Sequence, residues 1–495
     1  ASKVALHAWQ LLSGRDPVAT VLTKGSDSYD VGTASSIYIT DTGTYDAQAK
    51  NSNTFVIKTS KVVSSIKEII WKADGTEDQI LRASDKNAYD QFGYSVSIDG
   101  DYAIVGSRYQ GTGVNDVGAA YIYKRNTSTG VWGDEQKIQA SDKEQSDNFG
   151  HAVSINGDYA IVAANNEDTG GSDAGAVYMY TRNTSTGVWG NEQKIQASDK
   201  QQGDQFGYSV SISGNHVIVG SRYEDTGGSG AGAAYVYKRN TTTGVWGDEQ
   251  KIQASDKEQS DNFGNSVSLS GDYAIVGSVY EDHDVSGGNT LSSSGSAYIF
   301  KRSGTTWTQE TKITATDRGA GDQFGHSVSI SGDYAIVGSA NEDHDVSGGN
   351  TLSNAGSAYI FKRSGTTWTQ ETKIVATDRQ GGDTFGYSVS ISGNHVIVGS
   401  RYEDTGGSQA GAAYIFERSG TTWTEVKKIT ASDAQANDYF GFVVSISDGR
   451  AIFGAYNEDG GRGAAYIFEG VKPSGTRPTL TYDNANKLSL TGVTT

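Results

Sequence analysis

The amino-acid sequence predicts an all-β fold, a seven-bladed β-propeller, from three observations. A Phe-Gly pair recurs seven times at intervals of 55 to 61 residues, and each pair opens the motif D-x-F-G-x-S-V-S-I or a close variant. Short strands and turns repeated with a period of roughly 50 residues are typical of propellers and arrays. Seven is also a common number of blades for a closed ring. The pairs begin at Phe92, Phe149, Phe206, Phe263, Phe324, Phe385 and Phe440.

The repeat that spans Phe206 to Lys257 shows how the sequence builds one blade. Three runs rich in Val, Ile, Tyr and Ser (FGYSVSIS, HVIVGS and AAYVYKR) are separated by Gly- and Asn-rich turns, and WGDEQKIQAS supplies a fourth strand. The first strand alternates Ser with Val or Ile, so that one of its faces is small and the other bulky. Such faces allow neighbouring blades to interdigitate.

The tryptophans predict how the ring closes. Seven of the eight fall in register with the repeat, at Trp71, Trp132, Trp189, Trp246, Trp307, Trp368 and Trp423. Trp71 precedes the first Phe-Gly pair, whereas no tryptophan follows the third strand of the last repeat. We therefore expect the segment 68–85 to supply the outer strand of the seventh blade, closing the ring through an N-terminal strand and removing two exposed sheet edges.

The motif D-x-F-G, followed by V-G-S and then by A-G-A-A-Y-V-Y, resembles the FG-GAP repeat of integrin α-subunit heads and of related bacterial and lectin propellers. The resemblance covers residues 66–470 and implies a seven-bladed propeller. Integrin-type repeats often carry a calcium loop, D-x-D-x-D-G-x-x-D, between strands one and two. Here that place holds a short turn such as Asp99-Gly100-Asp101, so the calcium ligands of the family are not carried over.

Both ends of the chain are expected to be parts of an immunoglobulin-like sandwich. Residues 1–65 contain Asp41-Thr42-Gly43-Thr44-Tyr45, which resembles a D-x-G-x-Y tyrosine corner, and residues 471–495 contain two opening strands after a proline linker. Head and tail together would make one sandwich, so we expect a longer repeating polypeptide, or subunits whose tail completes the next subunit's head by strand addition. The alternative is a small independent N-terminal β-domain with a separate tail.

The composition excludes some classes of partner and site and bears on the expected location of the protein. The net charge of −18 argues against a nucleic-acid partner, and the lack of cysteine excludes a disulfide scaffold and a zinc-thiolate site. No apolar run is long enough to span a membrane. We expect an extracellular location or the surface of a cell or virion.

Strand directions place the loops between strands two and three and between strands four and one at the same end of the propeller. Acidic residues collect there, and the Asp before Phe-Gly is either the acceptor of an Asx-type turn or a ligand of Ca²⁺, which prefers six to eight oxygen ligands. The candidate metal ligands are Asp147, Asp168, Asp204, Asp225, Asp261, Asp282, Asp284, Asp322, Asp343, Asp345, Asp383 and Asp404.

Two repeats carry expanded loops at this end, EDHDVSGGNTLSSSG over 281–295 and EDHDVSGGNTLSNAG over 342–356. Long loops on a rigid scaffold are common binding sites, although a merely solvated loop is the alternative. The candidate ligand-binding residues are Asp282, His283, Asp284, Asn289, Asp343, His344, Asp345 and Asn350.

Asn126, Asn183 and Asn240 begin N-x-S/T sequons in the turn between strands three and four, and are candidates for glycosylation or simply turn residues. The chain carries no catalytic constellation that we recognise, such as a nucleophile elbow, a phosphate loop or H-E-x-x-H. His151 and His326 occupy the place of Tyr208 in sibling repeats and are interpreted as packing residues.

Together these observations favour a non-enzymatic extracellular structural or adhesion module, a repeating unit of a fibre, coat or appendage assembled through its terminal β segments. Its expected partners are further copies or neighbouring modules, and glycans or a surface protein. The alternative is a multivalent carbohydrate-binding propeller of the lectin type, which would use Trp, Tyr and Asp side chains. Function argued from fold is analogy, so binding experiments must decide between the two.

Overall fold

The computed structural model of the 495-residue chain describes residues 77–111, 116–288, 290–349 and 351–470 in full. Outside these ranges it describes only the strands β1 (Val21–Lys24), β2 (Asp27–Asp30), β3 (Tyr45–Asn51), β4 (Thr54–Thr59), β5 (Ile70–Trp71), the end of β33, β34 (Thr479–Tyr482) and β35 (Lys487–Thr491).

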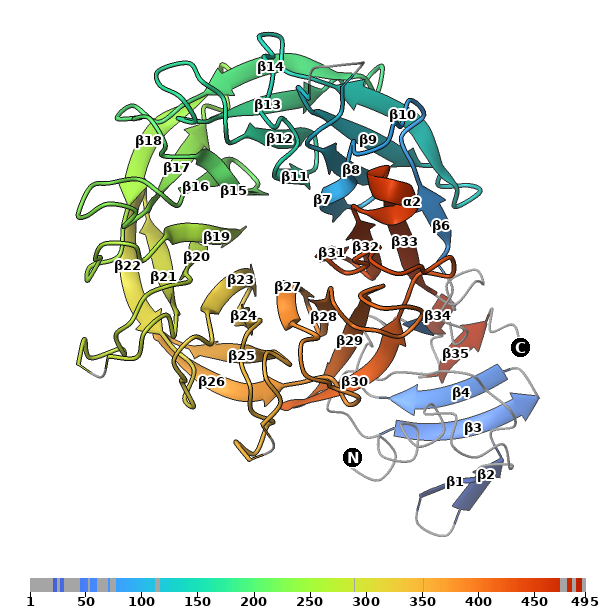
Figure 1. The fold of residues 1–495 in the computed structure, drawn as a ribbon. Helices are drawn as coiled ribbons and strands as arrows, with labels where there is room; N and C mark the ends of the chain where they lie inside the picture. Colours follow the sequence, from blue (N-terminus) through green and yellow to red (C-terminus); the bar gives the residue numbers. More distant parts are fainter. Residues whose placement is uncertain are drawn as a thin grey trace. The chain divides into compact units, whose positions relative to one another are not determined.

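Seven antiparallel sheets are arranged around a common centre, as Figure 1 shows. The Phe-Gly motif opens the strand closest to that centre in most of the sheets, and alternating Ser and Val or Ile follow it. These innermost strands are β7 (Phe92–Asp99), β11 (Val153–Asn156), β15 (Phe206–Ser213), β19 (Phe263–Ser270), β23 (Phe324–Ser331), β27 (Phe385–Ser392) and β31 (Val443–Ser447). The prediction of an all-β propeller with seven blades is confirmed.

The remaining strands of each blade follow outward in chain order. The second strands are β8 (Tyr102–Ser107), β12 (Tyr159–Ala164), β16 (His216–Ser221), β20 (Tyr273–Ser278), β24 (Tyr334–Ser339), β28 (His395–Ser400) and β32 (Arg450–Ala455). The third strands are β9 (Ala119–Arg125), β13 (Ala176–Arg182), β17 (Ala233–Arg239), β21 (Ser296–Ser303), β25 (Ser357–Ser364), β29 (Ala412–Ser419) and β33 (Ala464–Val471). The outermost strands of the first six blades are β10 (Trp132–Ile138), β14 (Trp189–Ile195), β18 (Trp246–Ile252), β22 (Thr306–Ile313), β26 (Thr367–Ile374) and β30 (Thr422–Ile429).

In the seventh blade, two short strands from ahead of the first Phe-Gly pair lie against β33. Residues of β6 (Gln79–Leu81) pair with Ala465–Ile467, and β5 pairs with the last two residues of β33. The Gln79 amide also donates to the carbonyl of Trp132 at 2.6 Å and accepts from its N–H at 2.8 Å. Gln136 makes the same two bonds with Trp189 in the next blade, so β6 takes the place of a fourth strand.

Neighbouring blades are joined along their innermost strands by serine hydroxyls. The N–H of Ile155 in the second blade donates to Ser97 Oγ of the first at 3.2 Å, and equivalent bonds follow around the ring. The last of them, from Ile98 N–H to Ser445 Oγ at 3.3 Å, links the seventh blade to the first. The small face of the alternating strand is therefore a hydrogen-bonding face.

The apolar core lies between the blades. One cluster of buried residues joins Ile104 and Ile138 of the first blade to Phe149, Tyr178 and Trp189 of the second. The corresponding cluster at the seventh blade joins Leu81, Ile452 and Ile467 to Phe92 and Trp132. Burying such large side chains supplies the main favourable term in folding, about 1.5–3 kcal/mol for each side chain.

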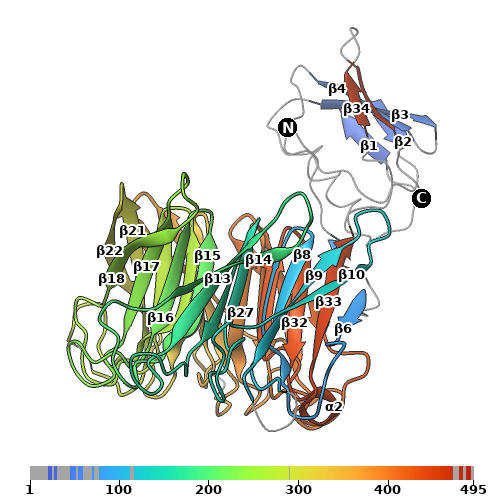
Figure 2. The same cartoon turned by 90° about the horizontal axis from the view of Figure 1, so that it is seen from above.

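The propeller has two distinct ends, seen side-on in Figure 2. One end carries the loops between strands two and three, the loops between strands four and one, and the short turn α2 (Glu458–Gly461). Backbone hydrogen bonds join these two sets of loops, for example Phe206 N–H to the carbonyl of Ala174 at 3.0 Å. We call this end the loop end. The hairpin turns lie at the other end.

The chain divides into two compact units, residues 73–469 and the combination of 1–72 with 470–495. In the second of these, one four-stranded sheet has the order β3-β4-β35-β34, so strands from the head and the tail of the same chain share a sheet. The expected tyrosine corner lies partly outside the described residues. Within the residues that are described, no helix is long and apolar enough to cross a membrane.

Candidate functional site at the loop end

In the D-x-F-G motif, the aspartate two residues before the phenylalanine stabilises its own loop. Asp204 is almost fully buried, and its Oδ2 accepts the N–H of Gln201 at 2.7 Å. Asp147, Asp261, Asp322 and Asp383 accept the N–H three residues upstream in the same way. The Asx-type turn is therefore the role that the structure gives these residues.

Burial makes these aspartates unusual acids. It raises the pKa of Asp204 to about 6 and that of Asp261 to about 7, against the opposing effect of the backbone N–H that each accepts. The negative charges of Glu224 and Glu281, one in each blade, push in the same direction as burial. A buried carboxyl with a raised pKa is common at functional sites, but here the same arrangement recurs around the ring.

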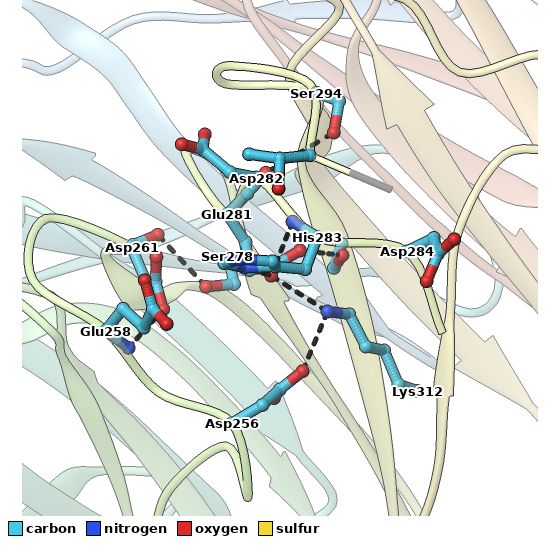
Figure 3. A network of polar contacts seen from close by, with 12 residues as sticks. Asp256, Glu258, Asp261, Ser278, Glu281, Asp282, His283, Asp284, Ser294 and Lys312 are labelled. Atoms are coloured by element: carbon cyan, nitrogen blue, oxygen red, sulfur yellow. Dashed lines mark hydrogen bonds and ion pairs between the residues drawn. The ribbon is translucent and has the colours of Figure 1, made fainter. Parts of the chain in front are cut away.

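Behind this turn lies a network of charges, drawn for the fourth blade in Figure 3. Lys312 Nζ lies 2.8 Å from both Asp256 Oδ2 and Glu281 Oε1. Glu281 is fully buried and also accepts from Ser296 Oγ at 2.6 Å. Burial alone would raise the pKa of Asp256, but the Lys312 ammonium and the Tyr298 hydroxyl lower it below its usual value.

The same network recurs in other blades. The lysines of the fourth strands bridge one Asp of the preceding A-S-D or A-T-D motif and one buried Glu of the E-D pair, namely Lys194 with Asp142 and Glu167, Lys251 with Asp199 and Glu224, Lys373 with Asp317 and Glu342, and Lys428 with Asp378 and Glu403. In the seventh blade, Arg82 replaces the lysine and pairs with Asp433 and Glu458 at 2.7 Å. The glutamates of the E-D pairs are thus neutralised inside the blades, which corrects the expectation that they add to an acidic surface.

The aspartates of the E-D pairs close the loops between strands two and three. Asp168, Asp225 and Asp404 each accept the N–H five residues downstream, at 2.8 to 2.9 Å. In the expanded loops, Asp282 accepts the N–H of Ser293 at 2.6 Å, and Asp343 accepts that of Asn354 at 2.7 Å.

The second aspartate of each expanded loop serves a separate turn. Asp284 and Asp345 each accept the N–H and the hydroxyl of the serine two residues downstream and the N–H of the glycine four residues downstream. Figure 3 shows Asp282 and Asp284 pointing away from each other. The D-x-D spacing therefore does not bring the two carboxylates together.

The histidines of the expanded loops face the buried glutamates. His283 Nδ1 lies 3.2 Å from Glu281 Oε1, and His344 Nδ1 lies 3.1 Å from Glu342 Oε1. These contacts hold the start of each loop against its blade. Asn289 and Asn350 lie outside the described residues. The structure thus brings His283 to Glu281 but does not gather the predicted ligand-binding residues of either loop into one cluster.

Nowhere in the fully described ranges do three or more His, Asp or Glu side chains form a group that could hold a metal ion. Each of the twelve candidate calcium ligands instead accepts a hydrogen bond from a nearby backbone N–H group. The turn role is thus present in the structure for these residues, and calcium binding stays a prediction.

The sequon asparagines are exposed turn residues. Asn126 Oδ1 accepts the N–H groups of Ser128 and Thr129 at 2.9 and 3.1 Å, and Asn183 and Asn240 repeat this pattern. The turn role is thus present in the structure, and glycosylation remains a prediction.

The tryptophans are packing residues. Trp132, Trp189, Trp246, Trp307, Trp368 and Trp423 are all buried, with at most 8% of the side chain exposed. Five of them lie 5.8 to 6.0 Å from a ring of the preceding blade, for example Trp189 at 5.8 Å from Tyr102. They present no face on which a sugar could stack, which removes the tryptophan argument for a lectin.

Sequence reasoning missed a cluster of rings around the propeller axis. The residue after each Phe-Gly pair contacts its counterpart in the neighbouring blade, with ring centroids 5.4 Å apart for Tyr94 and His151 and 5.1 Å apart for His151 and Tyr208. On the other side, His326, Tyr387, Phe442 and Tyr94 continue the series at 4.5 to 5.2 Å. We call these residues, with Asn265, the axial ring.

The interpretation of His151 and His326 as packing residues agrees with this arrangement. Burial lowers the pKa of His151 to about 3 and that of His326 to about 4, and nearby arginines act in the same direction. Both imidazoles are therefore neutral at physiological pH. The signal that could have found the axial ring is the aromatic character of one position in nearly every repeat.

Comparison with known proteins identifies one repeat family. No curated protein sequence matches the chain. Among solved structures, Saccharomyces cerevisiae Sqt1 is similar over 77% of this chain and 84% of its own, at 10% identity and a TM-score of 0.42. The FG-GAP repeat family matches seven segments, residues 76–123, 132–180, 189–237, 246–300, 307–361, 368–416 and 423–468. Each segment contributes an outer strand and the three inner strands of the following blade, and the chain therefore belongs to the FG-GAP repeat family.

Proposed function

We propose that this chain is a non-enzymatic extracellular adhesion or structural module that assembles with further copies through its terminal β strands. The FG-GAP propeller is consistent with a binding module of the adhesion type. The carboxylates of the loop end are occupied in turns and ion pairs, which favours a scaffold over a catalyst.

The observation that carries the assembly part is the pairing of β35 with β4. Only three residue pairs join them, Lys487 with Lys58, Leu488 with Ile57, and Ser489 with Val56. A strand that completes the sheet of its own chain can complete the same sheet in a second copy, because both partners offer identical edges. Exchange of β34 and β35 between copies would then build a head-to-tail fibre.

A pair of introduced cysteines tests this proposal, since the chain has none of its own. In the Val56→Cys/Ser489→Cys variant, oxidation links β4 to β35 covalently. We expect a ladder of disulfide-linked multimers on a non-reducing gel at high protein concentration. Either single variant has one cysteine and should give no band larger than a dimer. If the oxidised variant gives only covalent monomers at every concentration, and light scattering gives only the mass of a monomer, assembly by strand exchange is refuted.

A further inference from the structure

Three arginines lie beside the axial ring at the loop end. Arg108, Arg222 and Arg401 directly follow β8, β16 and β28. Their guanidinium carbons lie 3.7, 3.6 and 3.7 Å from the ring centroids of Tyr94, Tyr208 and Tyr387. A second tyrosine, the next residue in the chain, covers each guanidinium at 4.3 to 4.5 Å. Each cation is therefore held flat between aromatic faces.

These arginines have no anionic partner. Across the fully described ranges, no carboxylate lies within ion-pair distance of Arg108, Arg222 or Arg401. Most other arginines do have such a partner, as Arg125 has Glu469 and Arg302 has Asp272. Only the Nε atoms of Arg108 and Arg222 are engaged, by the amide oxygens of Gln91 and Gln205. A guanidinium stacked in this way presents its remaining N–H groups edge-on, in the geometry that binds an oxyanion with two hydrogen bonds.

Buried polar atoms without a hydrogen-bond partner occur at the same positions of the repeat. They include Arg401 Nε, His151 Nδ1 and the Oδ1 of Asn165, which takes the place of the arginine in the second blade. Thr384, which replaces the glutamine in the sixth blade, is a fourth case. Native proteins leave few buried polar groups unsatisfied, and although arginine Nε atoms are unsatisfied at other places too, such as Arg239 and Arg302, these histidine, asparagine and threonine atoms are specific to this region.

The arginines form one arc, because they are not present in every blade. Around the ring, the equivalent positions hold Arg401, Tyr456, Arg108, Asn165 and Arg222 in blades six, seven, one, two and three. Arg108 and Arg222 both act to lower the pKa of His151, and Arg108 and Arg401 both act to lower the pKa of Tyr456. The three cations therefore lie around one centre. Blades four and five complete the ring with Val279 and Ala340 and carry the expanded loops. The axis thus offers one asymmetric site in a nearly symmetric ring.

We propose that this arc of Arg108, Arg222 and Arg401 binds an acidic saccharide at the axis of the loop end. The guanidinium edges would hold its carboxylate or sulfate groups, and the tyrosine faces would lie against its sugar rings. Tyr223 and Tyr280 are 38% and 41% exposed and so offer such faces. The inference deepens the binding-module part of the proposed function and rests on it, but it does not depend on assembly.

Charge favours a small acidic ligand over an extended polyanion. The chain carries a net charge of −18, which repels a long nucleic acid at distance. Within a Debye length of about 8 Å at physiological salt, however, the three unpaired arginines can attract an anion directly. A short oligosaccharide with one or two acidic groups can reach them without crossing the acidic surface.

The test uses the full chain and isothermal titration with three oligosaccharides of matched length, one with uronic-acid carboxylates, one with sulfates, and one neutral. We expect at least one acidic ligand to bind and the neutral one not to bind. Raising the salt concentration from 50 to 500 mM should weaken binding at least tenfold, and the two acidic arms identify which oxyanion is preferred.

Arg108→Gln, Arg222→Gln and Arg401→Gln should each weaken that binding at least fivefold, and the triple variant should abolish it. Arg239→Gln is the matched control, because Arg239 also stacks on a tyrosine, 4.6 Å from Tyr159, but at the hairpin end. Unchanged melting temperatures separate lost contacts from unfolding. Binding that survives the triple variant, equal binding of the neutral saccharide, or no binding by the wild type would each overturn the proposal. None of these outcomes bears on the cysteine ladder, so the two proposals fail separately.

Discussion

The glycine of each Phe-Gly pair packs directly against the backbone of the preceding blade. Gly264 has a φ of +92°, in the left-handed region that favours glycine, and a methyl group there would collide with the carbonyl oxygen of Ala233. The preceding phenylalanine is fully buried, with Phe263 5.5 Å from Tyr298. The signature therefore combines a large core residue with the one residue that permits close contact between blades.

Replacing Gly264 with Ala should destabilise the propeller by about 3 kcal/mol or more, because strain at positive φ and a backbone collision add together. Gly271, in the hairpin turn of the same blade, is the control. Its φ of +57° is also left-handed, but nothing lies within 4 Å of an added methyl group. Gly271→Ala should cost only about 1 kcal/mol. Urea unfolding of both variants measures the difference, and equal losses would contradict the packing argument.

The buried aspartates predict an unusual dependence of stability on pH. Their folded-state pKa values of about 6 to 7 lie above the unfolded value of about 3.9. Between these values only the folded chain holds the proton, so the contribution of these carboxyls to stability is greatest below about pH 4 and is lost as pH rises from there to about 6 to 7. Asp142, Asp199, Asp256 and Asp378 have lowered pKa values, and their contribution is lost below about pH 4.

Melting temperatures measured between pH 5 and 8.5 at constant ionic strength should therefore fall up to about pH 7 and then level off. Asp261→Asn keeps the acceptor for the Glu258 N–H and removes the charge. The loss of unfolding free energy as pH rises should therefore be smaller in this variant by on the order of 1 kcal/mol. The exposed Asp248, changed to Asn, should leave the slope as it is. A wild-type protein that becomes more stable from pH 5 to 8 would show that these carboxyls stay ionised.

At the scale of the element, β6 and the residues after it stand in for a missing fourth strand. Leu81 enters the core between the seventh and first blades, Gln79 makes the bonds of a strand-four glutamine, and Arg82 supplies the cation for Glu458. The hydrogen bond between Arg82 and Asp433 spans 351 residues of the sequence. Ring closure is thus a long-range contact that loop-closure entropy opposes until the blades are in place.

Arg82→Met should cost about 3–5 kcal/mol, since it leaves the buried Glu458 carboxylate without its cation. Lys86→Met is the control, because Lys86 lies 4.0 Å from Asp459 at the surface and such pairs contribute less than about 1 kcal/mol.

Deleting residues 66–85 should lower the melting temperature further by opening the ring. A truncated chain that melts near the wild-type temperature would disprove this role of the segment.

At the scale of the whole molecule, the fold could be predicted from the sequence because one sequence pattern recurs seven times. The Phe-Gly period gave the blade number, and the position of Trp71 pointed to the segment that contains β6. The carboxylates misled, because sequence shows how many oxygens are near one another but not which backbone N–H groups they already serve. Asp282 and Asp284 are only two residues apart in the sequence, yet each closes a different turn.

The axial ring could not be predicted for a related reason. Tyr94 and His151 are a whole repeat apart and differ in residue type, so only the closed ring brings their side chains together. Likewise, the arginines at 108, 222 and 401 occur in three repeats and look like irregular variation along the chain. Their significance depends on which blades face one another around the axis.

The pairing of β4 with β35 has a mechanical consequence. If the chain is pulled by its two ends, the load passes from the head strands to the tail strands through this one sheet. The seven blades are inserted between β4 and β34, so they form a bypassed loop that carries no tension while the sheet holds. Once the three residue pairs separate, force reaches the β5–β33 contact and then the β6–β33 contact that closes the ring.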